Sequence, residues 1–432
     1  MKNLNFIKIK DVFEKKPEKV YLRGWVYRHR VQKDVVFILL RDSSGIIQCT
    51  LKKGEVSDDT FEKARSLTIE SSVKIEGTLK EDKRAPGGFE VKGTNLEVVH
   101  KAERFPIGRD LSEEFLLDVR HLWIRSQKLT NVFKVRSKVF EAIREFFYKR
   151  GFYETHSPVI IPGVAEEGPT LFEVKYYKDK AYLTQTWQLY AEALIFGLEN
   201  IFTIAPTFRA EKSRTSRHLT EFWMTEAEMV WCDLDCCIKI SEELISHICQ
   251  KVAKECEKEL KALGRDPKEL VKIKPPFPRI TYTEALEILE KDGMKVKWGK
   301  DLRTIEERQL MTHYDKPLIV THYPKDVMAF YKPKDPKNPK TARCYDILCP
   351  ELGIEIVGGS ERDLSIKDLE ESLKKKGENV KNYEFYFDTR RYGSIPHAGF
   401  GLGTERVIQW ICKLDHIRDT IPFPRTAKRY KP

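Results

Sequence analysis

Two segments far apart in the chain bring cationic, acidic and aromatic side chains into close spacing. The first carries Phe208, Arg209, Ala210, Glu211, Arg217, His218, Leu219 and Phe222, and the second carries Gly403, Thr404, Glu405 and Arg406. A guanidinium such as that of Arg209 donates in one plane to two oxygens, so it can bridge a phosphate and a carboxylate. Glu211 can accept from an adenine amino group. Phe222 and Arg406 can contact the two faces of the adenine ring. This set suits the binding of a bent ATP and attack on its α-phosphate.

A four-residue match such as 208–211 (FRAE) also arises by chance, and the second arginine segment, 401–406 (GLGTER), is what gives it weight. A third segment, 353–362 (GIEIVGGSER), adds a glutamate and an arginine. On these motifs the chain resembles the class II aminoacyl-tRNA synthetases of the aspartyl, asparaginyl and lysyl subgroup. Within the subgroup it is most similar to the archaeal-type asparaginyl branch, and the resemblance extends over nearly the whole chain.

The resemblance implies that a substrate carboxylate attacks the α-phosphorus of ATP in line while pyrophosphate leaves. The protein then supplies positioning and charge, and no protein nucleophile is required. This agrees with the lack of a G-x-S-x-G or a Walker-type G-x-x-x-x-G-K-[ST] motif. We expect Arg209 to stabilise the transition state, and Arg217, His218 and Arg406 to hold the β- and γ-phosphates. The ATP-binding set implied by the resemblance is Arg209, Ala210, Glu211, Arg217, His218, Leu219, Phe222, Glu355, Gly403, Thr404, Glu405 and Arg406.

A divalent cation, Mg²⁺, is the second cofactor that the resemblance implies. Glu355 is the first candidate ligand and, with Arg209 and Arg406, belongs to the expected catalytic set. Asp346 is the second candidate ligand. It lies nine residues before Glu355, whereas the aspartyl relatives have an aspartate seven residues before the glutamate. Carboxylate oxygens are the ligands that Mg²⁺ prefers.

The amino-acid pocket is expected to form from segments that resemble the family's pocket. The implied set is Glu166, Gln185, Gln188, Arg209, Glu226, Gly358 and Arg362. Glu166, with Glu167 as its alternative, corresponds to the glutamate that meets the substrate α-amino group. Trp187 stands where the family usually has a small residue, and His397 suits either the pocket wall or a structural role.

One position in the expected pocket bears on the choice of substrate. Aspartyl enzymes have a lysine where this chain has Ala191, and that lysine meets the substrate side-chain carboxylate. Arg362 remains to bind a side-chain oxygen, and Glu226 can accept from an amide NH₂ and would repel a second carboxylate. An unpaired carboxylate in a partly dry pocket costs more free energy than an amide. We therefore expect L-asparagine to be the substrate.

The first hundred residues predict a small β-barrel. Apolar runs at 20–26, 35–40, 46–51, 72–79 and 88–99 read as five strands, with a turn at 42–45 and a helix at 60–66. This pattern is typical of an OB-fold, which binds single-stranded nucleic acid, although a purely structural barrel has the same pattern. By resemblance, Arg28, Phe37 and Gln48 are expected to contact the tRNA anticodon, with Phe37 stacking on its central base.

The rest of the chain predicts a mixed α and β domain. Apolar residues at helical spacing over 132–147 predict a helix that ends near Gly151, and an extended run follows over 152–161. This unit resembles the motif that forms the homodimer interface of the family. Further helices are expected over 235–263 and 282–292, and a Pro/Lys-rich surface loop over 332–340.

The expected fold class is thus α+β, an N-terminal five-stranded OB-fold barrel followed by a class II synthetase catalytic domain with an antiparallel sheet flanked by helices. The predicted domains are an anticodon-binding domain over 1–102, a linker over 103–128 and the catalytic domain over 129–432.

Composition agrees with an enzyme that meets a polyanion. The 432 residues carry a formal net charge of +11, with 41 % hydrophobic and 33 % charged residues. Neither an apolar run of the ~20 residues that span a bilayer nor a signal-peptide core is present, so we expect a cytoplasmic protein without a membrane partner. The nine cysteines form no C-x-x-C pair, and we expect them to be buried, reduced thiols.

The expected activity is therefore ATP-dependent formation of asparaginyl-AMP, followed by transfer of asparagine to the 3′-terminal adenosine of tRNA(Asn) by a homodimeric ligase. Three alternatives stay open at this point. One is an aspartyl-tRNA synthetase, including one that charges both tRNAs, against which Ala191 argues. Another is an adenylate-forming asparagine synthetase paralogue, although such paralogues lack the barrel. The last is an RNA-binding protein with a decayed catalytic core, which the retained arginines and glutamates disfavour.

Overall fold

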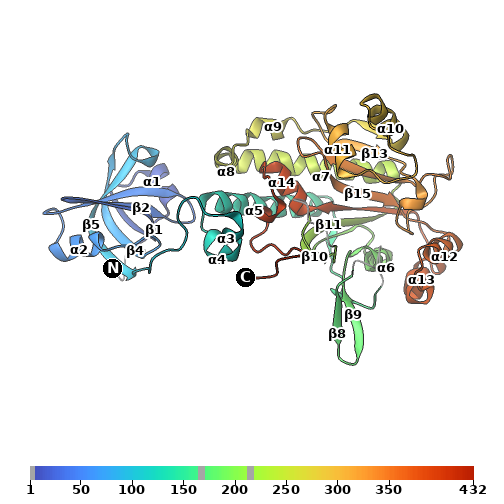
Figure 1. Cartoon of the computed structure of the whole chain (residues 1–432), viewed down its shortest axis with the longest axis horizontal. Coiled ribbons are helices and arrows are strands. Elements are labelled where there is room, and N and C mark those ends of the chain that lie inside the picture. Colours follow the sequence, from blue (N-terminus) through green and yellow to red (C-terminus); the bar gives the residue numbers. More distant parts are fainter. Residues whose placement is uncertain (1–4, 164–170, 212–217) are drawn as a thin grey trace. The chain divides into compact units, whose positions relative to one another are not determined.

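The computed structural model describes residues 5–163, 171–211 and 218–432 (Figure 1). The chain divides into two compact units, Met1–Leu116 and Leu117–Pro432. Each unit has its own hydrophobic core, and the functional residues fall into both.

The first unit contains the predicted five-stranded barrel, closed in the order β1-β2-β3-β5-β4. Its strands are β1 Lys19–Gln32, β2 Val35–Arg41, β3 Ile46–Lys52, β4 Ser72–Glu81 and β5 Phe89–His100. Its helices are α1 Ile9–Lys15 and α2 Asp58–Arg65, with a short turn η1 at Pro86–Gly88. The alternation of Val36, Ile38 and Leu40, all fully buried, with partly exposed neighbours gives β2 one face toward the core.

The turn between β2 and β3 lies where the sequence predicts it. The side chain of Asp42 accepts from the backbone N–H groups of Ser44 and Gly45, at 2.7 and 3.1 Å. It also accepts from the N–H of Ile9 at 2.9 Å, so the same carboxylate closes the hairpin and holds the start of α1.

The second unit is built around an eight-stranded sheet in the order β12-β13-β14-β15-β16-β11-β10-β6. Its strands are β6 Tyr153–Glu154, β10 Ile201–Phe208, β11 Glu221–Val230, β12 Arg279–Thr281, β13 Leu318–Thr321, β14 Cys344–Cys349, β15 Ile354–Glu361 and β16 His397–Gly403. A smaller sheet in the order β7-β9-β8 contains β7 Ile160–Ile161, β8 Glu173–Tyr176 and β9 Asp179–Leu183. The large sheet is antiparallel except at its two edges, where β12–β13 and β6–β10 pair in parallel.

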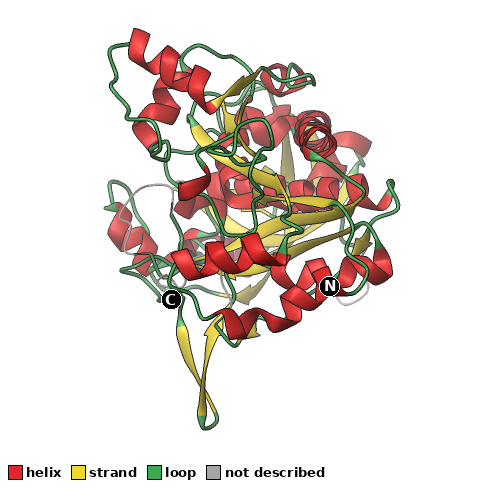
Figure 2. Cartoon of the chain, turned by 90° about the vertical axis from the view of Figure 1, so that its right-hand side faces the viewer, coloured by secondary structure: helices red, strands yellow, loops and turns green. Residues whose placement is uncertain are grey.

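Helices surround the strands of the large sheet, and the hairpin β8–β9 projects from the unit (Figure 2). The longer helices are α5 Gln127–Tyr148, α6 Gln188–Leu198, α7 Leu234–Glu255, α10 Tyr282–Lys291, α11 Thr304–Met311, α12 Ile366–Lys375, α13 Glu384–Arg391 and α14 Thr404–Ile411. The shorter ones are α3 Glu113–Asp118, α4 Arg120–Trp123, α8 Glu257–Ala262, α9 Pro267–Val271, η3 Lys325–Val327, η4 Val380–Tyr383 and η5 Ile417–Thr420. Buried side chains of α5, α7 and α14 share one core with β10, β11, β15 and β16.

Three sequence expectations for this unit differ from the structure in detail. The helix expected over 235–263 is two helices, α7 and α8, because Cys256 between them has the non-helical angles φ −119° and ψ 29°. The extended run over 152–161 is split between two sheets, with β6 in the large one and β7 in the small one. Gly151, with φ of +78°, lies in the turn two residues beyond the C-cap of α5.

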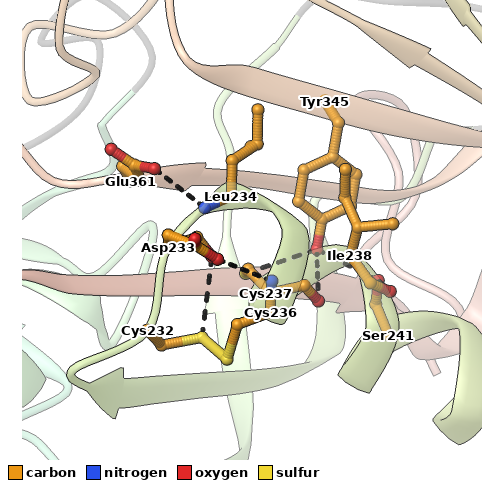
Figure 3. The surroundings of a disulfide bond; sticks show 9 residues. All are labelled: Cys232, Asp233, Leu234, Cys236, Cys237, Ile238, Ser241, Tyr345 and Glu361. Carbon is orange, nitrogen blue, oxygen red and sulfur yellow. Dashed lines mark hydrogen bonds between the residues drawn. A yellow bond between two sulfur atoms is a disulfide. The ribbon is translucent and has the colours of Figure 1, made fainter.

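A disulfide joins Cys232 and Cys236 at the start of α7, so the prediction that all nine cysteines are reduced thiols is wrong for this pair (Figure 3). Asp233, the N-cap of α7, accepts from the N–H of Cys236 at 2.9 Å. This first turn of helix brings the two Cα atoms to 5.4 Å, within the range that a disulfide requires. The other seven cysteines form no disulfide and are buried, as predicted.

Candidate active site

One face of the large sheet carries a trough whose floor includes Gly401 and Gly403 of β16. Gly399, Gly401 and Gly403 alternate along this strand, so all three face the same side. Gly401 pairs with Glu226 of β11 on one side and with Gly358 of β15 on the other. Because residues directly opposite one another in a sheet point to the same face, the missing side chains leave room between β11 and β15.

The nucleotide end of the trough brings together most of the predicted ATP-binding residues. The cavity there is lined by Arg209, Glu211, His218, Leu219, Phe222, Met224, Glu355, Ile356, Gly401, Gly403, Glu405, Arg406 and Ile417. The Arg209 guanidinium lies 5.7 Å from the centre of the Phe222 ring. On the opposite wall Arg406 donates to the backbone oxygen of Glu355 at 2.9 Å and to its carboxylate at 3.2 Å. Two cations and an aromatic ring thus face one space, as stacking on a purine and binding of its phosphates require.

Glu211 and His218 lie near each other at the mouth of this cavity. The His218 Nε2 atom is 3.8 Å from a carboxylate oxygen of Glu211, and both side chains are about one-third exposed. Ala210 lies between Arg209 and Glu211 but does not line the cavity. Arg217, the third predicted phosphate ligand, lies outside the described residues.

Two predicted ATP-binding residues are placed chiefly to hold the walls of the site. Thr404 is fully buried, and its hydroxyl lies 3.1 Å from that of Thr225 on β11. Glu405 accepts from the backbone N–H of Trp223 at 2.9 Å and pairs with Arg136 of α5 at 2.7 Å. Burial raises the pKa of Glu405 above its ordinary value, and Arg136 opposes the rise. Glu405 reaches the cavity wall, whereas Thr404 does not.

The second end of the trough brings together the described residues of the predicted amino-acid pocket. Gln185, Gln188, Glu226, Gly358 and Arg362 all line this cavity, and Arg209 and Glu355 line both cavities. Glu166, and its alternative Glu167, lie outside the described residues. A molecule that reaches from one cavity to the other must therefore pass Arg209 and Glu355.

Arg362 is held in a fixed orientation at the base of the second cavity. Its Nε and Nη2 atoms donate to the two carboxylate oxygens of Glu228, at 2.9 and 2.8 Å, and its Nη1 donates to Ser360 at 2.8 Å. Burial raises the pKa of Glu228 above its ordinary value, and the Arg362 guanidinium opposes the rise. A Cβ on Gly399 would come within 2.1 Å of the Glu228 carboxylate, so this ion pair requires glycine there.

Glu226 occupies the wall beside Arg362, but its carboxylate already has protein donors. It accepts from the Thr186 hydroxyl and, at 2.9 Å, from the backbone N–H of Trp187. These two bonds orient the Glu226 carboxylate in the cavity wall. Trp187 lines this cavity but is only 2 % exposed, and it packs with Ala191, Ile195, Ile201 and Val230.

Asp346 and Glu355, the predicted metal ligands, lie together beside Gly358. A Cβ on Gly358 would lie 2.9 Å from a Glu355 carboxylate oxygen and 3.3 Å from one of Asp346. The pKa of Asp346 is held well above its ordinary value, because the carboxylate is largely removed from bulk water and Glu355 carries a like charge nearby. Two adjacent carboxylates with oxygens on one cavity fit a hard divalent cation such as Mg²⁺, which would relieve that repulsion.

Several residues of the second cavity were not predicted from the sequence, and three of them, Glu228, Tyr331 and Lys332, carry polar side chains that bear on its chemistry. Glu228 lies two positions after Glu226 on β11, and strand alternation was the signal that could have placed it on the same face. Tyr331 and Lys332 also line this cavity, so the first residue of the expected surface loop 332–340 belongs to the site. No local pattern distinguishes Lys332 from the other lysines of that loop, most of which are exposed.

The predicted anticodon residues share the outer face of the barrel. Arg28 lies opposite Leu39, which lies opposite Gln48, and Phe37 is two positions from Leu39 on β2. Residues in such positions point to one side of the sheet. Phe37 is partly exposed and not part of the barrel core, and Gln48 donates to Glu90 at 3.0 Å. The face therefore presents a ring, an amide and a guanidinium within the first three strands.

The comparisons with known proteins agree with this arrangement. The family model described as tRNA synthetases class II (D, K and N) matches residues 112–427, and the model described as an OB-fold nucleic acid binding domain matches residues 20–99. The asparagine–tRNA ligase of Thermoplasma acidophilum is 48 % identical, with 96 % of each chain covered, and that of Thermococcus gammatolerans is 46 % identical, with 97 % of each covered. The crystal structure of the asparaginyl-tRNA synthetase from Pyrococcus horikoshii complexed with asparaginyl-adenylate superposes with a TM-score of 0.96 at 45 % identity, and 100 % of both chains is covered.

Proposed function

The chain belongs to the class II tRNA synthetases of the D, K and N group, and from this we propose that it is an asparagine–tRNA ligase. It activates L-asparagine with ATP to asparaginyl-AMP and transfers asparagine to the 3′-terminal adenosine of tRNA(Asn). The observation that carries the proposal is the pair of cavities on one trough, which share Arg209 and Glu355.

The roles of the side chains follow from their places in the trough. The asparagine side chain lies against Arg362 and Glu226, and its α-carboxylate points toward Arg209. The Arg209 fork holds that carboxylate and the α-phosphate of ATP at once, so the attacking oxygen and the phosphorus are brought into line. As charge grows on the α-phosphate, the preorganised guanidinium stabilises it more strongly than in the ground state.

The purine and the leaving pyrophosphate take the other cavity. Phe222 and Arg406 contact the two faces of the adenine, and His218 and Arg217 bind the outer phosphates. Asp346 and Glu355 would hold Mg²⁺, which when bound supplies positive charge to the phosphate oxygens. Arg406 donates to the carboxylate of Glu355, so it also keeps that side chain oriented toward the cavity.

The choice of asparagine over aspartate rests on the charges around the second cavity. Ala191, where a lysine would favour a substrate carboxylate, is fully buried in an apolar cluster. Glu226 lines the cavity and repels a second carboxylate, while it can accept from the NH₂ of an amide. Arg362 then donates to the amide oxygen.

We also propose that the enzyme is a homodimer. Tyr153 on β6, the edge strand of the large sheet, is 58 % exposed, and Tyr148 at the end of α5 is 53 % exposed. Ile160 on β7, an edge strand of the small sheet, is 48 % exposed. Exposed apolar side chains beside an edge strand are suited to a subunit contact. Light scattering of the purified protein should give twice the chain mass. No helix in the described ranges is long and apolar enough to cross a bilayer, and the cytoplasmic location stays a prediction.

The test of the proposed function is ATP–pyrophosphate exchange with asparagine and with aspartate, without tRNA. Exchange with asparagine alone, followed by charging of tRNA(Asn), is the expected result. Exchange with aspartate would mean that Arg362 outweighs the missing lysine. The protein would then be tested for charging of both tRNAs and for synthesis of free asparagine.

A further inference from the structure

Two glutamates, two arginines and a histidine lie buried at and behind the wall of the amino-acid cavity. They come from α6, β11, the end of β15, α13 and β16, and none is more than 7 % exposed. The five are Glu192, Glu228, Arg362, Arg390 and His397. Only Glu228 and Arg362 line the cavity, and the roles proposed above for the substrate contacts leave the other three unassigned.

Glu192 lies close to three other members of this cluster, Arg362, Arg390 and His397. It is fully buried and accepts from Arg390 at 2.6 Å, from the Tyr386 hydroxyl at 2.8 Å and from Gln188 at 2.9 Å, and its Oε2 lies 3.0 Å from the Nε2 of His397. Burial acts to raise the pKa of Glu192, but the Arg390 and His397 contacts outweigh it and hold this pKa well below its ordinary value. The side chain is therefore a fully buried carboxylate with four protein donors.

The first consequence concerns Gln188, which lies one helical turn before Glu192 on α6 and lines the cavity. An ionised carboxylate can only accept, so the NH₂ of the Gln188 amide must be the end that faces Glu192. The carbonyl oxygen of that amide is then left for the cavity. An acceptor at this position suits the NH₂ group of a ligand and is unfavourable to a carboxylate.

The second consequence concerns the charge of Arg362. Its Nε lies 3.8 Å from Glu192 Oε1, in addition to the two bonds that it donates to Glu228. Two buried carboxylates beside one guanidinium reduce the positive potential that it presents to the cavity. With its charge offset by these two carboxylates, Arg362 can still donate to the amide oxygen of a substrate, but it favours a substrate carboxylate less strongly.

We propose that Glu192 is a specificity-determining positioning residue, which favours an amide over a carboxylate in the amino-acid pocket through Gln188 and Arg362. It does so without touching the substrate. This inference rests on the proposed function, because it names the residue that biases the same pocket toward asparagine.

The test is Glu192→Gln, assayed by ATP–pyrophosphate exchange with asparagine and aspartate at several concentrations of each. The variant removes the charge at nearly constant volume and frees the Gln188 amide to turn. The ratio of kcat/KM for asparagine to that for aspartate should fall by about tenfold or more, through a higher KM for asparagine and a lower KM for aspartate. This ratio is independent of the fraction of folded enzyme, so a loss of stability alone does not move it.

Two variants serve as controls. Glu192→Asp keeps the charge and should retain most of the ratio. Glu306→Gln neutralises a buried glutamate that is 1 % exposed in α11, outside both cavities, and should leave the ratio unchanged.

The outcomes separate this inference from the proposed function. If wild-type enzyme exchanges with asparagine but Glu192→Gln keeps its ratio within about twofold, or loses exchange with both amino acids, Glu192 belongs to the fold and the inference fails. If wild-type enzyme does not exchange with asparagine at all, the proposed function itself fails.

Discussion

At the scale of single residues, Arg209 is a side chain that lines both cavities. It extends from the end of β10, where its backbone N–H donates to Thr220 at 3.0 Å, and it lines the trough on both sides of the junction. A group at that junction touches the attacking carboxylate and the α-phosphate in the same step. Its contribution should therefore appear in the rate of adenylate formation more than in the binding of either substrate alone.

Replacing Arg209 by alanine should lower the rate of pyrophosphate exchange by at least 10²–10³-fold, the usual cost of losing one transition-state donor. Arg209→Lys should recover only part of the activity, because an ammonium is a point charge and cannot bridge two oxygens in one plane. Arg279→Ala, which breaks a surface pair with Asp235 outside both cavities, is the matched control. Wild-type-like exchange by Arg209→Ala would remove this residue from the mechanism, provided circular dichroism shows a folded protein.

Some residues of the site can be predicted from short sequence motifs, and others can be identified only from the three-dimensional structure. Arg209, Glu355 and Arg362 belong to short motifs whose residue types alone indicate phosphate and carboxylate chemistry. Glu228 and Glu192 belong to no such motif, and their importance comes from partners more than 100 positions away in the chain. Burial and long-range pairing are three-dimensional properties, so a buried carboxylate held by arginines cannot be told from a surface one in the sequence.

At the scale of elements, local periodicity predicted the strands of the barrel and helix α5 well, since each has a continuous apolar pattern of period two or 3.6. The parallel edges of the large sheet were not predicted. They were missed because β6 and β12, with two and three residues, are too short to carry a sequence pattern of their own. The break between α7 and α8 was missed for a related reason, since the apolar pattern continues across Cys256.

The disulfide at the start of α7 predicts a simple thiol count. Alkylation of the denatured but unreduced protein should label the seven cysteines outside the disulfide, and prior reduction should raise the number by two. Mass spectrometry of the peptides should place the protected pair at Cys232 and Cys236. Labelling of all nine without reduction would show that the pair is a dithiol in solution.

Lys325 of η3 predicts a specific dependence of stability on pH. Its ammonium donates to the backbone oxygens of Phe330 and Lys332, and burial lowers its pKa to about 8. Above that pH the unfolded chain binds a proton that the folded chain lacks, so the free energy of unfolding rises with pH up to the ordinary lysine value. Below pH 8 both states are protonated and this contribution is constant.

Lys325→Met should abolish that rise. Relative to the variant, wild-type protein should gain roughly 2 kcal/mol in the free energy of unfolding between pH 8 and 9.5, at about 1.36 kcal/mol per pKa unit. Urea titrations at several pH values measure the difference. Lys337→Met, at an exposed lysine of the loop 332–340, is the control. Parallel curves for wild type and Lys325→Met would contradict the assignment.

At the scale of the whole molecule, the chemistry and the recognition of nucleic acid are assigned to different compact units. Among the described residues, those that line the two cavities all belong to the second unit, and Arg28, Phe37 and Gln48 belong to the first. Each unit has a separate hydrophobic core, so a change on the barrel surface need not disturb the trough. This division makes the two steps of the proposed reaction separable by mutation.

Phe37→Ala tests that separation. Base–aromatic stacking contributes about 1–3 kcal/mol per base, so charging of tRNA(Asn) should lose roughly five- to hundredfold in kcat/KM for the tRNA. Pyrophosphate exchange with asparagine, which needs no tRNA, should stay at the wild-type rate. Phe89→Ala removes a barrel phenylalanine that packs edge-on against Phe13, away from the face of β1–β3, and it should leave both activities intact. If Phe37→Ala lowered exchange and charging together, the barrel would be a support for the catalytic unit, and the recognition of the anticodon would have to be sought elsewhere on the chain.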